Sequence, residues 1–455
     1  MKLLIVGAGR TGCSLIEMLA RLNYDITIID KDKSKVNEIT DRYNVNGFVG
    51  SGASKASLMA AGADTADILF ALTPVDEINI LSCMQAKKLG VLRCVARVSQ
   101  PDFAAERESL KKEEHIDYIL NPKYDMAEEA ALSIGLPGFV KPEGVFGGYM
   151  QMITVTVLPD SPLAGKTLID IRRDLEAEII VGTVLREGKL YVPDGSFRLR
   201  EGDRISVVSG IDGLIKNLRK IGIVKNPARK VIIYGGGTTA EYLIQMLLKK
   251  KKAVTVIEPQ LERCRELSEK YPTVNVSYGE GEIVDILAEE GISSADAMVS
   301  LTSTDEINLS VSMYAWSLNV PSILTRIDSP KHLNLLHKVN LDITLSPSEI
   351  SVDKLVRFIH NCEAGDAPNG IEKYYSIADN KAEVIQFTAG DDFAKPDVMF
   401  KEPSFKLRKN VLIASIIRDG ELIIPGGNSS IHTGDKVIIV SDRKNHVVNL
   451  NEIFA

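Results

Sequence analysis

The stretch LLIVGAGRTG, residues 3–12, decides the fold, because an apolar run passes directly into three spaced glycines. Such a run is typical of a parallel strand that is buried on both faces. Gly7 permits a tight turn, Gly9 lets the backbone approach a pyrophosphate, and Gly12 lets the following helix pack close to the strand. Asp30 ends the next predicted strand, where a carboxylate can accept both hydroxyls of an adenosine ribose and repel a 2′-phosphate. These residues predict a site for NAD or an adenine nucleotide rather than for NADP.

The same arrangement occurs again in the stretch VIIYGGGTTA, residues 231–240. Gly235 lies 228 residues after Gly7, and Glu258 lies 228 residues after Asp30. A constant offset is the mark of an internal repeat. With one residue inserted, the register continues at an offset of 229 through GSG and GEG at 50–52 and 279–281, LTPVDEIN and LTSTDEIN at 72–79 and 301–308, and ARV and TRI at 96–98 and 325–327. It continues at an offset of 232 through REG and RDG at 186–188 and 418–420, and GD at 202–203 and 434–435. The chain is therefore a tandem duplication.

Each half is predicted to hold a parallel sheet followed by a smaller part. Strands that alternate with helices favour a doubly wound parallel sheet. In the first half the expected strands are 2–6, 26–29, 47–49, 68–72, 93–98 and 118–120, and the expected helices are 11–22, 34–43, 54–61, 77–89 and 101–113. Short β runs at 152–157, 179–185 and 204–208, separated by glycine turns, then predict a small α+β subdomain. The fold class is α/β, with two tandem Rossmann-like sheets, each followed by a small α+β subdomain.

The predicted boundaries follow from the proline-rich stretches between these parts. Pro122, Pro137 and Pro142 interrupt a stretch that otherwise reads as helix, so a linker with some helix is expected there. The predicted parts are a nucleotide-binding subdomain at 1–121, a helical linker at 122–147, an α+β subdomain at 148–224, a second nucleotide-binding subdomain at 229–346, a second helical linker at 347–381 and a second α+β subdomain at 382–455.

Composition limits the function classes. The 455 residues are 45% hydrophobic and 25% charged, which is the profile of a soluble globular protein rather than a disordered one. The net charge of −7 makes the chain a poor candidate for binding nucleic acid. The N-terminus lacks the long apolar region of a signal peptide, and no 18 consecutive residues are apolar. If the protein acts in a membrane process, another chain must supply the membrane part.

Three further groups are candidates, each with a plainer alternative. The segments Ser51-Gly52 and Gly279-Glu280 end the third strand of each half and could meet the adenine or ribose, or they could be ordinary turns. Arg97 and Arg326 end another strand and could bind a phosphate or a partner carboxylate, or form surface ion pairs. Asp76 begins a predicted helix and could have a role near the nucleotide or an ion, or else Thr73 or Asp76 could simply cap the helix.

The second nucleotide site is open to two interpretations. Ala240 stands where the third glycine of the motif is expected, and a small residue can satisfy the packing requirement there. The second copy could thus bind a nucleotide, or it could be a degenerate copy that is kept for assembly.

The sequence contains none of the common catalytic signatures: no HExxH, no GxSxG and no GxxxxGK[ST]. The five cysteines have no metal-ligand spacing, and no metal site is predicted. A dehydrogenase of this length normally devotes a second domain to its substrate, with a Lys, His or Tyr as acid or base. This chain uses that length for a second cofactor fold, which favours sensing over turnover. An NAD-dependent oxidoreductase remains the alternative from a different class.

The glycine segments with Asp30, the GSG and LTxxDEIN segments and the ARV segment, together with their copies, resemble the TrkA family of regulatory subunits of Trk potassium uptake systems. The resemblance covers nearly the whole chain and implies two tandem RCK units, each with an N-terminal nucleotide-binding and a C-terminal subdomain. It implies binding of NAD or NADH, or of ATP or ADP, without enzymatic turnover. It also implies a homo-oligomeric ring in the cytoplasm that docks peripherally on a membrane potassium channel of the TrkH or TrkG type. A regulator of a Ktr-type channel or of an efflux antiporter is the alternative.

By this resemblance the cofactor-binding residues fall into two sets. The first set is Gly7, Ala8, Gly9, Arg10, Thr11, Gly12, Asp30, Ser51, Gly52, Leu72, Thr73 and Arg97. The second set is Gly235, Gly236, Gly237, Thr238, Thr239, Glu258, Gly279, Glu280, Leu301, Thr302 and Arg326. Two residues depart from the family pattern: Ala240 replaces a glycine, and Glu280 stands where the family often has Asp.

Overall fold

The computed structural model divides into two compact units. The first consists of residues 1–131, 230–320 and 324–356, and the second of 132–229, 321–323 and 357–455. Parts of the same kind from the two halves are therefore grouped together. The residues described are 1–20, 24–100, 116–137, 140–146, 150–210, 213–224, 228–279, 281–329, 332, 343–365, 371–378, 381–445 and 447–455.

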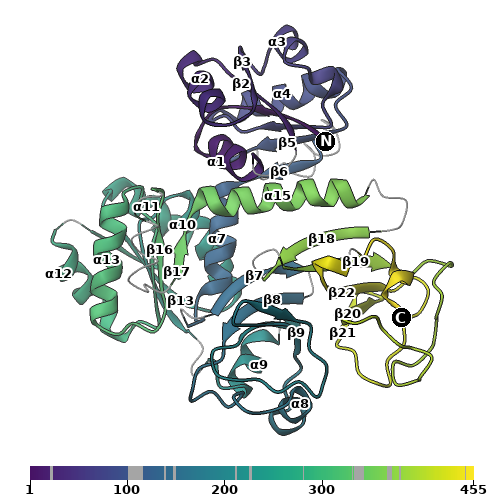
Figure 1. Ribbon diagram of the computed structural model, residues 1–455. Helices are drawn as coiled ribbons and strands as arrows, with labels where there is room; N and C mark the ends of the chain where they lie inside the picture. Colours follow the sequence, from purple (N-terminus) through teal and green to yellow (C-terminus); the bar gives the residue numbers. More distant parts are fainter. Residues whose placement is uncertain are drawn as a thin grey trace. The chain divides into compact units, whose positions relative to one another are not determined.

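The first unit begins with a six-stranded sheet in the order β3-β2-β1-β4-β5-β6, all of whose paired strands run parallel (Figure 1). Its strands are β1 (Lys2–Val6), β2 (Asp25–Asp30), β3 (Asn46–Val49), β4 (Ile68–Ala71), β5 (Arg93–Arg97) and β6 (Tyr118–Leu120). Its helices are α1 (Arg10–Leu19), α2 (Lys33–Arg42), α3 (Lys55–Ala60) and α4 (Asp76–Lys88). The order confirms the predicted Rossmann-like sheet. The bounds of β1 and β6 are the predicted ones, and those of the other elements differ from the prediction by at most three residues. The helix predicted at 101–113 lies outside the described residues.

The second sheet of this unit repeats the first, in the order β14-β13-β12-β15-β16-β17. Its strands are β12 (Lys230–Tyr234), β13 (Ala253–Glu258), β14 (Asn275–Tyr278), β15 (Ala297–Ser300), β16 (Ile323–Arg326) and β17 (Ile343–Leu345). Its helices are α10 (Thr238–Lys249), α11 (Leu261–Lys270), α12 (Ile283–Glu289) and α13 (Asp305–Ser317). The first strands of both sheets, β1 and β12, are buried from their second residue onward, as expected for central parallel strands.

The second unit holds two five-stranded antiparallel sheets with the same topology. Their orders are β10-β9-β11-β8-β7 and β18-β19-β22-β20-β21. The first contains β7 (Val140–Phe146), β8 (Met150–Thr156), β9 (Ile180–Arg186), β10 (Lys189–Tyr191) and β11 (Arg204–Gly210), with helices α8 (Leu168–Leu175) and α9 (Leu214–Lys220). The second contains β18 (Ile371–Ile377), β19 (Ala382–Thr388), β20 (Val411–Arg418), β21 (Glu421–Ile423) and β22 (Lys436–Asp442). The predicted α+β class is correct for the first subdomain.

The segments that the sequence assigned to helical linkers are only partly helical. Helices α7 (Pro122–Ser133) and α15 (Pro347–Gly365) occupy their first parts. Pro122 begins α7 instead of breaking a helix, because a proline at the first helical position has no N–H to leave unpaired. Strands β7 and β18 follow within these ranges and pair with β8 and β19, so Pro142 lies within a strand at a register shift. Apart from these strands, the predicted boundaries stay predictions.

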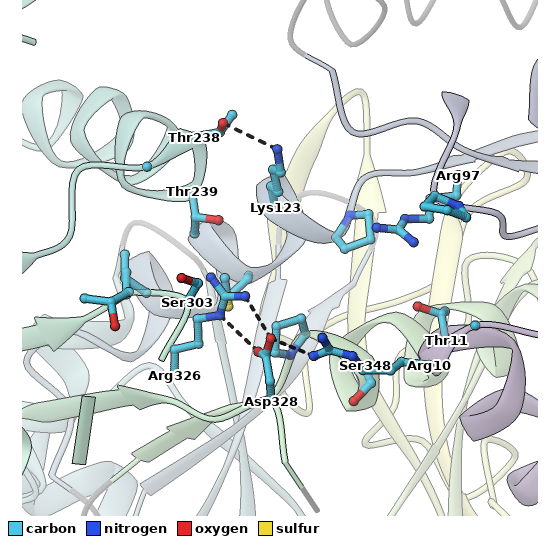
Figure 2. A pocket seen from close by; sticks show the side chains of 18 of the residues that line it. Arg10, Thr11, Arg97, Lys123, Thr238, Thr239, Ser303, Arg326, Asp328 and Ser348 are labelled. Atoms are coloured by element: carbon cyan, nitrogen blue, oxygen red, sulfur yellow. Dashed lines mark hydrogen bonds and ion pairs between the residues drawn. The ribbon is translucent and has the colours of Figure 1, made fainter. Parts of the chain in front are cut away.

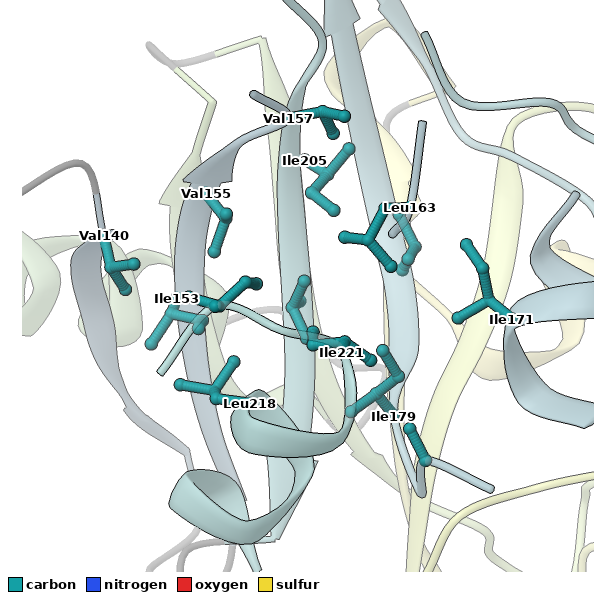
Figure 3. Packing of buried hydrophobic residues seen from close by; sticks show 14 of the residues in the cluster. Val140, Ile153, Val155, Val157, Leu163, Ile171, Ile179, Ile205, Leu218 and Ile221 are labelled. Atoms are coloured by element: carbon teal, nitrogen blue, oxygen red, sulfur yellow. The ribbon is translucent and has the colours of Figure 1, made fainter. Parts of the chain in front are cut away.

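The antiparallel sheet of the first half packs one face against α8, α9 and the turns around them. Figure 3 shows this cluster, in which Ile153, Val155 and Ile205 of the strands lie with Leu218 of α9 and Ile171 of α8. Each of these side chains is at most 2% exposed. No helix in the described part of the chain is both long enough and apolar enough to cross a membrane.

The REG and GD segments of the repeat form a buried ion pair in each antiparallel sheet. Arg186 Nε and Nη2 donate to the two carboxylate oxygens of Asp203, both at 2.7 Å. Arg418 binds Asp435 in the same way, at 2.9 and 2.7 Å. The carboxylates also accept backbone N–H groups, from Arg200 and from His432. This bidentate pair explains why these residues match at an offset of 232 in the sequence.

Candidate functional site

Two of the three glycines of the first loop are required by the fold, and the third leaves an open space. Gly7 has φ +107°, and a Cβ there would lie 3.0 Å from Thr73 N. A Cβ on Gly12 would lie only 2.1 Å from the Gly7 carbonyl oxygen. A Cβ on Gly9 would meet no atom within 4 Å, so the chain itself does not require glycine there. The open space above Gly9, at the start of α1, is where the motif predicts the pyrophosphate.

The second loop has nearly the same geometry. Gly235 has φ +101°, and its Cβ would lie 3.0 Å from Thr302 N, while a Cβ on Gly237 would meet nothing within 4 Å. Ala240 is fully buried at the position of Gly12. The second loop therefore accommodates the methyl group that the first cannot, and the substitution leaves the open space above Gly237 intact.

The carboxylates predicted to bind ribose also hold the loops. Asp30 Oδ2 accepts Ala8 N at 2.6 Å, and Glu258 Oε2 accepts Gly236 N at 2.6 Å. Each second oxygen accepts the N–H two residues further along, at 2.9 Å in both halves. Because each carboxylate oxygen has two lone pairs, it can still accept a ligand hydroxyl. The carboxylate thus positions the loop and faces the cleft at the same time.

The LTxxDEIN segments do not cap their helices as predicted. The N-cap residue of α4 is Val75, and it makes no side-chain cap hydrogen bond. Asp76 instead reaches across to the end of β5, where its Oδ2 accepts the N–H groups of Ser99 and Gln100 at 2.8 and 2.7 Å. Asp305 likewise accepts the N–H groups of Asp328 and Ser329, one with each carboxylate oxygen and both at 2.9 Å. The acid at this position therefore ties the helix start to the segment that follows the arginine strand.

Asn79, which is fully buried in α4, holds two backbone segments of the site in place. Its amide oxygen accepts Thr73 N and Oγ1 at 2.9 and 2.7 Å, and its amide nitrogen donates to the carbonyls of Thr73 and Arg97 at 2.9 and 2.8 Å. Asn308 makes the same four bonds to Thr302 and Arg326. The repeat of LTxxDEIN in the sequence marked this residue, but its function needed the structure.

Replacing Asn79 with alanine is expected to destabilise the first nucleotide subdomain by about 1–2 kcal/mol, because buried backbone groups of Thr73 and Arg97 lose their partners. Glu77→Ala, at an exposed position of the same helix, is the control and should stay within about 0.5 kcal/mol of the unaltered chain. Chemical denaturation of the full chain measures both changes. Equal stability of the two variants would show that Asn79 does not hold the site.

The two arginines at the strand ends differ. Arg326 donates from Nε and Nη2 to Asp328, both at 3.0 Å, and Asp328 also accepts Arg10 Nη1 at 2.9 Å (Figure 2). The Arg97 side chain makes no hydrogen bond or ion pair with any residue that the structure describes, and its Nε is buried. Burial is the main cause that lowers the pKa of Arg97. The ion-pair interpretation therefore holds for Arg326, and the Arg97 guanidinium is free to meet a ligand.

Both loops open into one cleft of about 800 Å³ within the first unit. Two linker helices also start at this cleft: Lys123 of α7 donates to Thr238 at 3.4 Å, and Ser348 of α15 lies near Arg10 (Figure 2). Lys354 of α15 pairs with Asp125 and Glu128 of α7, at 2.7 and 2.8 Å. Residues from both halves of the chain therefore line this one cleft.

The structure brings most of the predicted site residues to the cleft. Those that line it are Gly7, Gly9, Arg10, Thr11, Asp30, Leu72, Arg97, Gly235, Gly237, Thr238, Thr239, Glu258, Leu301, Thr302 and Arg326. Ala8, Gly12, Ser51, Gly52, Thr73, Gly236 and Gly279 are not among the lining residues, and Glu280 lies outside the described residues. A Cβ on Gly52 would lie 2.1 Å from Val6 Cγ1, which is a packing reason for that glycine. Sequence reasoning missed Lys35, Lys123, Asp328 and Ser348, whose contact with the cleft depends on the fold.

The chain matches two family models, the TrkA-N domain over residues 3–122 and 231–347 and the TrkA-C domain over residues 152–222. It is 29% identical over its full length to the full length of a Trk system potassium uptake protein TrkA homolog of Archaeoglobus fulgidus. It is 30% identical to TrkA homolog 2 of Methanosarcina mazei, over 96% of this chain and 97% of that protein. The TrkA protein of Halomonas elongata is 27% identical, over 100% of this chain and 98% of that protein.

Solved structures give the same fold. The GsuK RCK domain matches 97% of this chain with 92% of its own, at a TM-score of 0.63 and 17% identity. The GsuK channel bound to NAD matches 97% of this chain with 77% of its own, at a TM-score of 0.62 and 17% identity. At this identity the likeness concerns the fold alone.

Proposed function

The chain belongs to the TrkA family of Trk system potassium uptake proteins, and from this premise we propose that it is the regulatory subunit of a membrane potassium transport system and senses adenine nucleotides. The observation that carries the proposal is the pair of glycine loops, each with its carboxylate, that open into one cleft. The partner would be a channel of the TrkH or TrkG type. The chain would act from the cytoplasmic side as a peripheral subunit.

The cleft favours NAD, NADH, ADP or ATP over NADP. Unpaired N–H groups at the starts of α1 and α10 can bind phosphate, and the helix dipole adds about 0.3–1 kcal/mol for an anion at each. Asp30 and Glu258 line the same cleft and would repel a 2′-phosphate on the adenosine ribose. Which of the four ligands is the physiological one depends on the residues beyond the ribose, among them Arg97 and Arg326.

The lining of the cleft supports sensing rather than turnover. Its described residues include no His, Cys or Tyr that could act as a general acid or base at neutral pH. They are instead mostly glycines, threonines, prolines and basic side chains from both halves, the basic ones being Arg10, Lys35, Arg97, Lys123 and Arg326. Such a lining binds phosphate, and its carboxylates, Asp30, Glu258 and Asp328, already accept hydrogen bonds from backbone N–H groups or from arginine. The chain would therefore hold its ligand without consuming it.

The proposed mechanism is a population shift in a ring of copies of this chain. A nucleotide that contacts both halves binds best to the arrangement in which those contacts are all made, and it therefore favours that arrangement. Moving a two-state equilibrium from 1:99 to 99:1 needs about 5.5 kcal/mol of differential affinity. Several sites in a ring could share this requirement. The ring would pass the change to the attached channel and alter its open probability.

The experiment that tests the proposal uses Gly9→Ala and Gly237→Ala, since the chain itself leaves room for both methyl groups. Each methyl group would occupy the space expected for the pyrophosphate. We expect at least a tenfold loss of nucleotide affinity at the altered loop, with the midpoint of thermal unfolding nearly unchanged. Potassium flux through the reconstituted channel should lose its response to nucleotide in the double variant. Met18→Ala, at an exposed position of α1, is the control.

A double variant that still gates potassium flux in response to nucleotide would contradict the proposal. So would a chain that binds none of the four nucleotides in calorimetry. The oxidoreductase alternative predicts a different result, namely a change in NADH absorbance when the chain is mixed with a substrate.

A further inference from the structure

The two nucleotide sites are not equivalent. They differ in the residue that lies two positions after the arginine at the end of β5 or of β16. Arg326 follows Arg97 by 229 residues, and in the same register Asp328 takes the place of Ser99. The backbone N–H groups of both residues make the same bond, to Asp305 and to Asp76. The two backbones therefore run alike, and only the side chain differs.

Asp328 binds the guanidinium of Arg326 in the way that a phosphate would. Its two oxygens accept Nε and Nη2 of Arg326, both at 3.0 Å, and one of them also accepts Arg10 Nη1 at 2.9 Å (Figure 2). A guanidinium presents one planar fork that fits either a carboxylate or a phosphate. As long as Asp328 holds that fork, a second anion can bind Arg326 only by displacing the carboxylate or by lying beside its negative charge.

In the first half, the arginine at the strand end has the opposite environment. Ser99 carries no charge, and its Oγ is buried without a hydrogen-bond partner among the described residues. Arg97 Nε is buried and unpartnered as well, although the side chain lines the cleft. The acid whose charge acts on Arg97 is Asp76, whose Oδ2 already accepts two backbone N–H groups. A cation that lines a cleft and has a buried donor without a partner is a place that an anionic group would complete.

We propose that Asp328 is a specificity-determining residue: it is an internal anion that closes the second loop's arginine to phosphate, while Ser99 leaves Arg97 open to phosphate in the first loop. The inference rests on the proposed function, because it assumes that both loops bind adenine nucleotides. The first loop then takes the nucleotide with an added phosphate near Arg97, and the second prefers a ligand that places no charge beside Arg326. Because Asp328 also holds Arg10 of the first loop, removal of its charge releases an arginine of each loop.

The test exchanges the two side chains in the full chain, as Asp328→Ser and Ser99→Asp. Neither exchange removes the backbone N–H that binds Asp305 or Asp76. The first loop is studied with Gly237→Ala present and the second with Gly9→Ala present, so that each titration reports one loop. Calorimetry at one fixed salt concentration then gives the affinities for ADP and for adenosine. Their ratio measures what the phosphates contribute.

We expect Asp328→Ser to raise the ADP-to-adenosine affinity ratio of the second loop about tenfold, and Ser99→Asp to lower that of the first loop by a similar factor. Asp328→Asn, which keeps the shape and removes the charge, should act in the same direction as Asp328→Ser. It also serves if the serine variant does not fold.

Ratios that stay within twofold of those of the unexchanged chain would overturn the inference. The proposed function would survive that outcome, provided that the unaltered chain binds nucleotide and its loop variants do not. A chain whose loops bind neither ADP nor adenosine would overturn both. Equal ADP-to-adenosine ratios at the two unexchanged loops would also overturn the inference.

Discussion

Gly12→Val is expected to unfold or loosen the first nucleotide subdomain while the second keeps its fold. The Cβ of the new side chain would lie 2.1 Å from the Gly7 carbonyl oxygen, which is a backbone atom and cannot rotate away as a side chain can. We expect a loss of stability on the order of 3 kcal/mol, as for severe overpacking of a core position. Movement of Gly7 would also displace Gly9 and the start of α1. Nucleotide binding at the first loop should therefore be lost together with stability.

Ala240→Gly, at the matching position of the second loop, is the control for this variant. The second loop already accommodates a methyl group there, so the change should cost only about 0.5–1 kcal/mol, through the lower helix propensity of glycine. Thermal unfolding and nucleotide titration measure both variants. If Gly12→Val were as stable as Ala240→Gly, the close contact in the first loop would not limit what can stand there.

Asp203→Ala is expected to destabilise the first antiparallel sheet by about 3–5 kcal/mol, because it leaves the Arg186 guanidinium without its partner. The Asp203 side chain is fully buried, and Arg186 is only 19% exposed. The same change removes the acceptor of Arg200 N. Denaturant unfolding of the full chain, followed by circular dichroism, should show an earlier transition.

Asp174→Ala provides the matched control, since that carboxylate also pairs with an arginine but is itself exposed on α8. Asp174 accepts Arg173 Nε at 3.0 Å, with side chains 37% and 68% exposed. A surface pair of this kind contributes about 0–1 kcal/mol. Comparable losses for Asp203→Ala and Asp174→Ala would mean that burial of the Arg186 pair has no energetic consequence.

The internal repeat identified structurally important residues more reliably than any single motif did. LTxxDEIN and the REG and GD segments could be found because two copies kept them in register, although their functions were not evident. The predicted cap at Asp76 was wrong because an acid at a helix start satisfies the same pattern whether it binds its own helix or a neighbouring strand. Asn79 and Asp203 were marked as repeated, but a buried partner is a property of the fold.

The amino-acid order alone determined the duplication, the two parallel sheets and the loop-and-carboxylate pairs, because each depends on residues that are close along the chain or that recur at a fixed offset. Tertiary structure decided what those residues meet. It placed β7 and β18 in sheets whose edges no local pattern specifies, and it brought Arg10 to Asp328, which lies 318 residues away. The physical reason is that strand pairing and ion pairing depend on which surfaces come together, and a sequence pattern reports only which surfaces are apolar or charged.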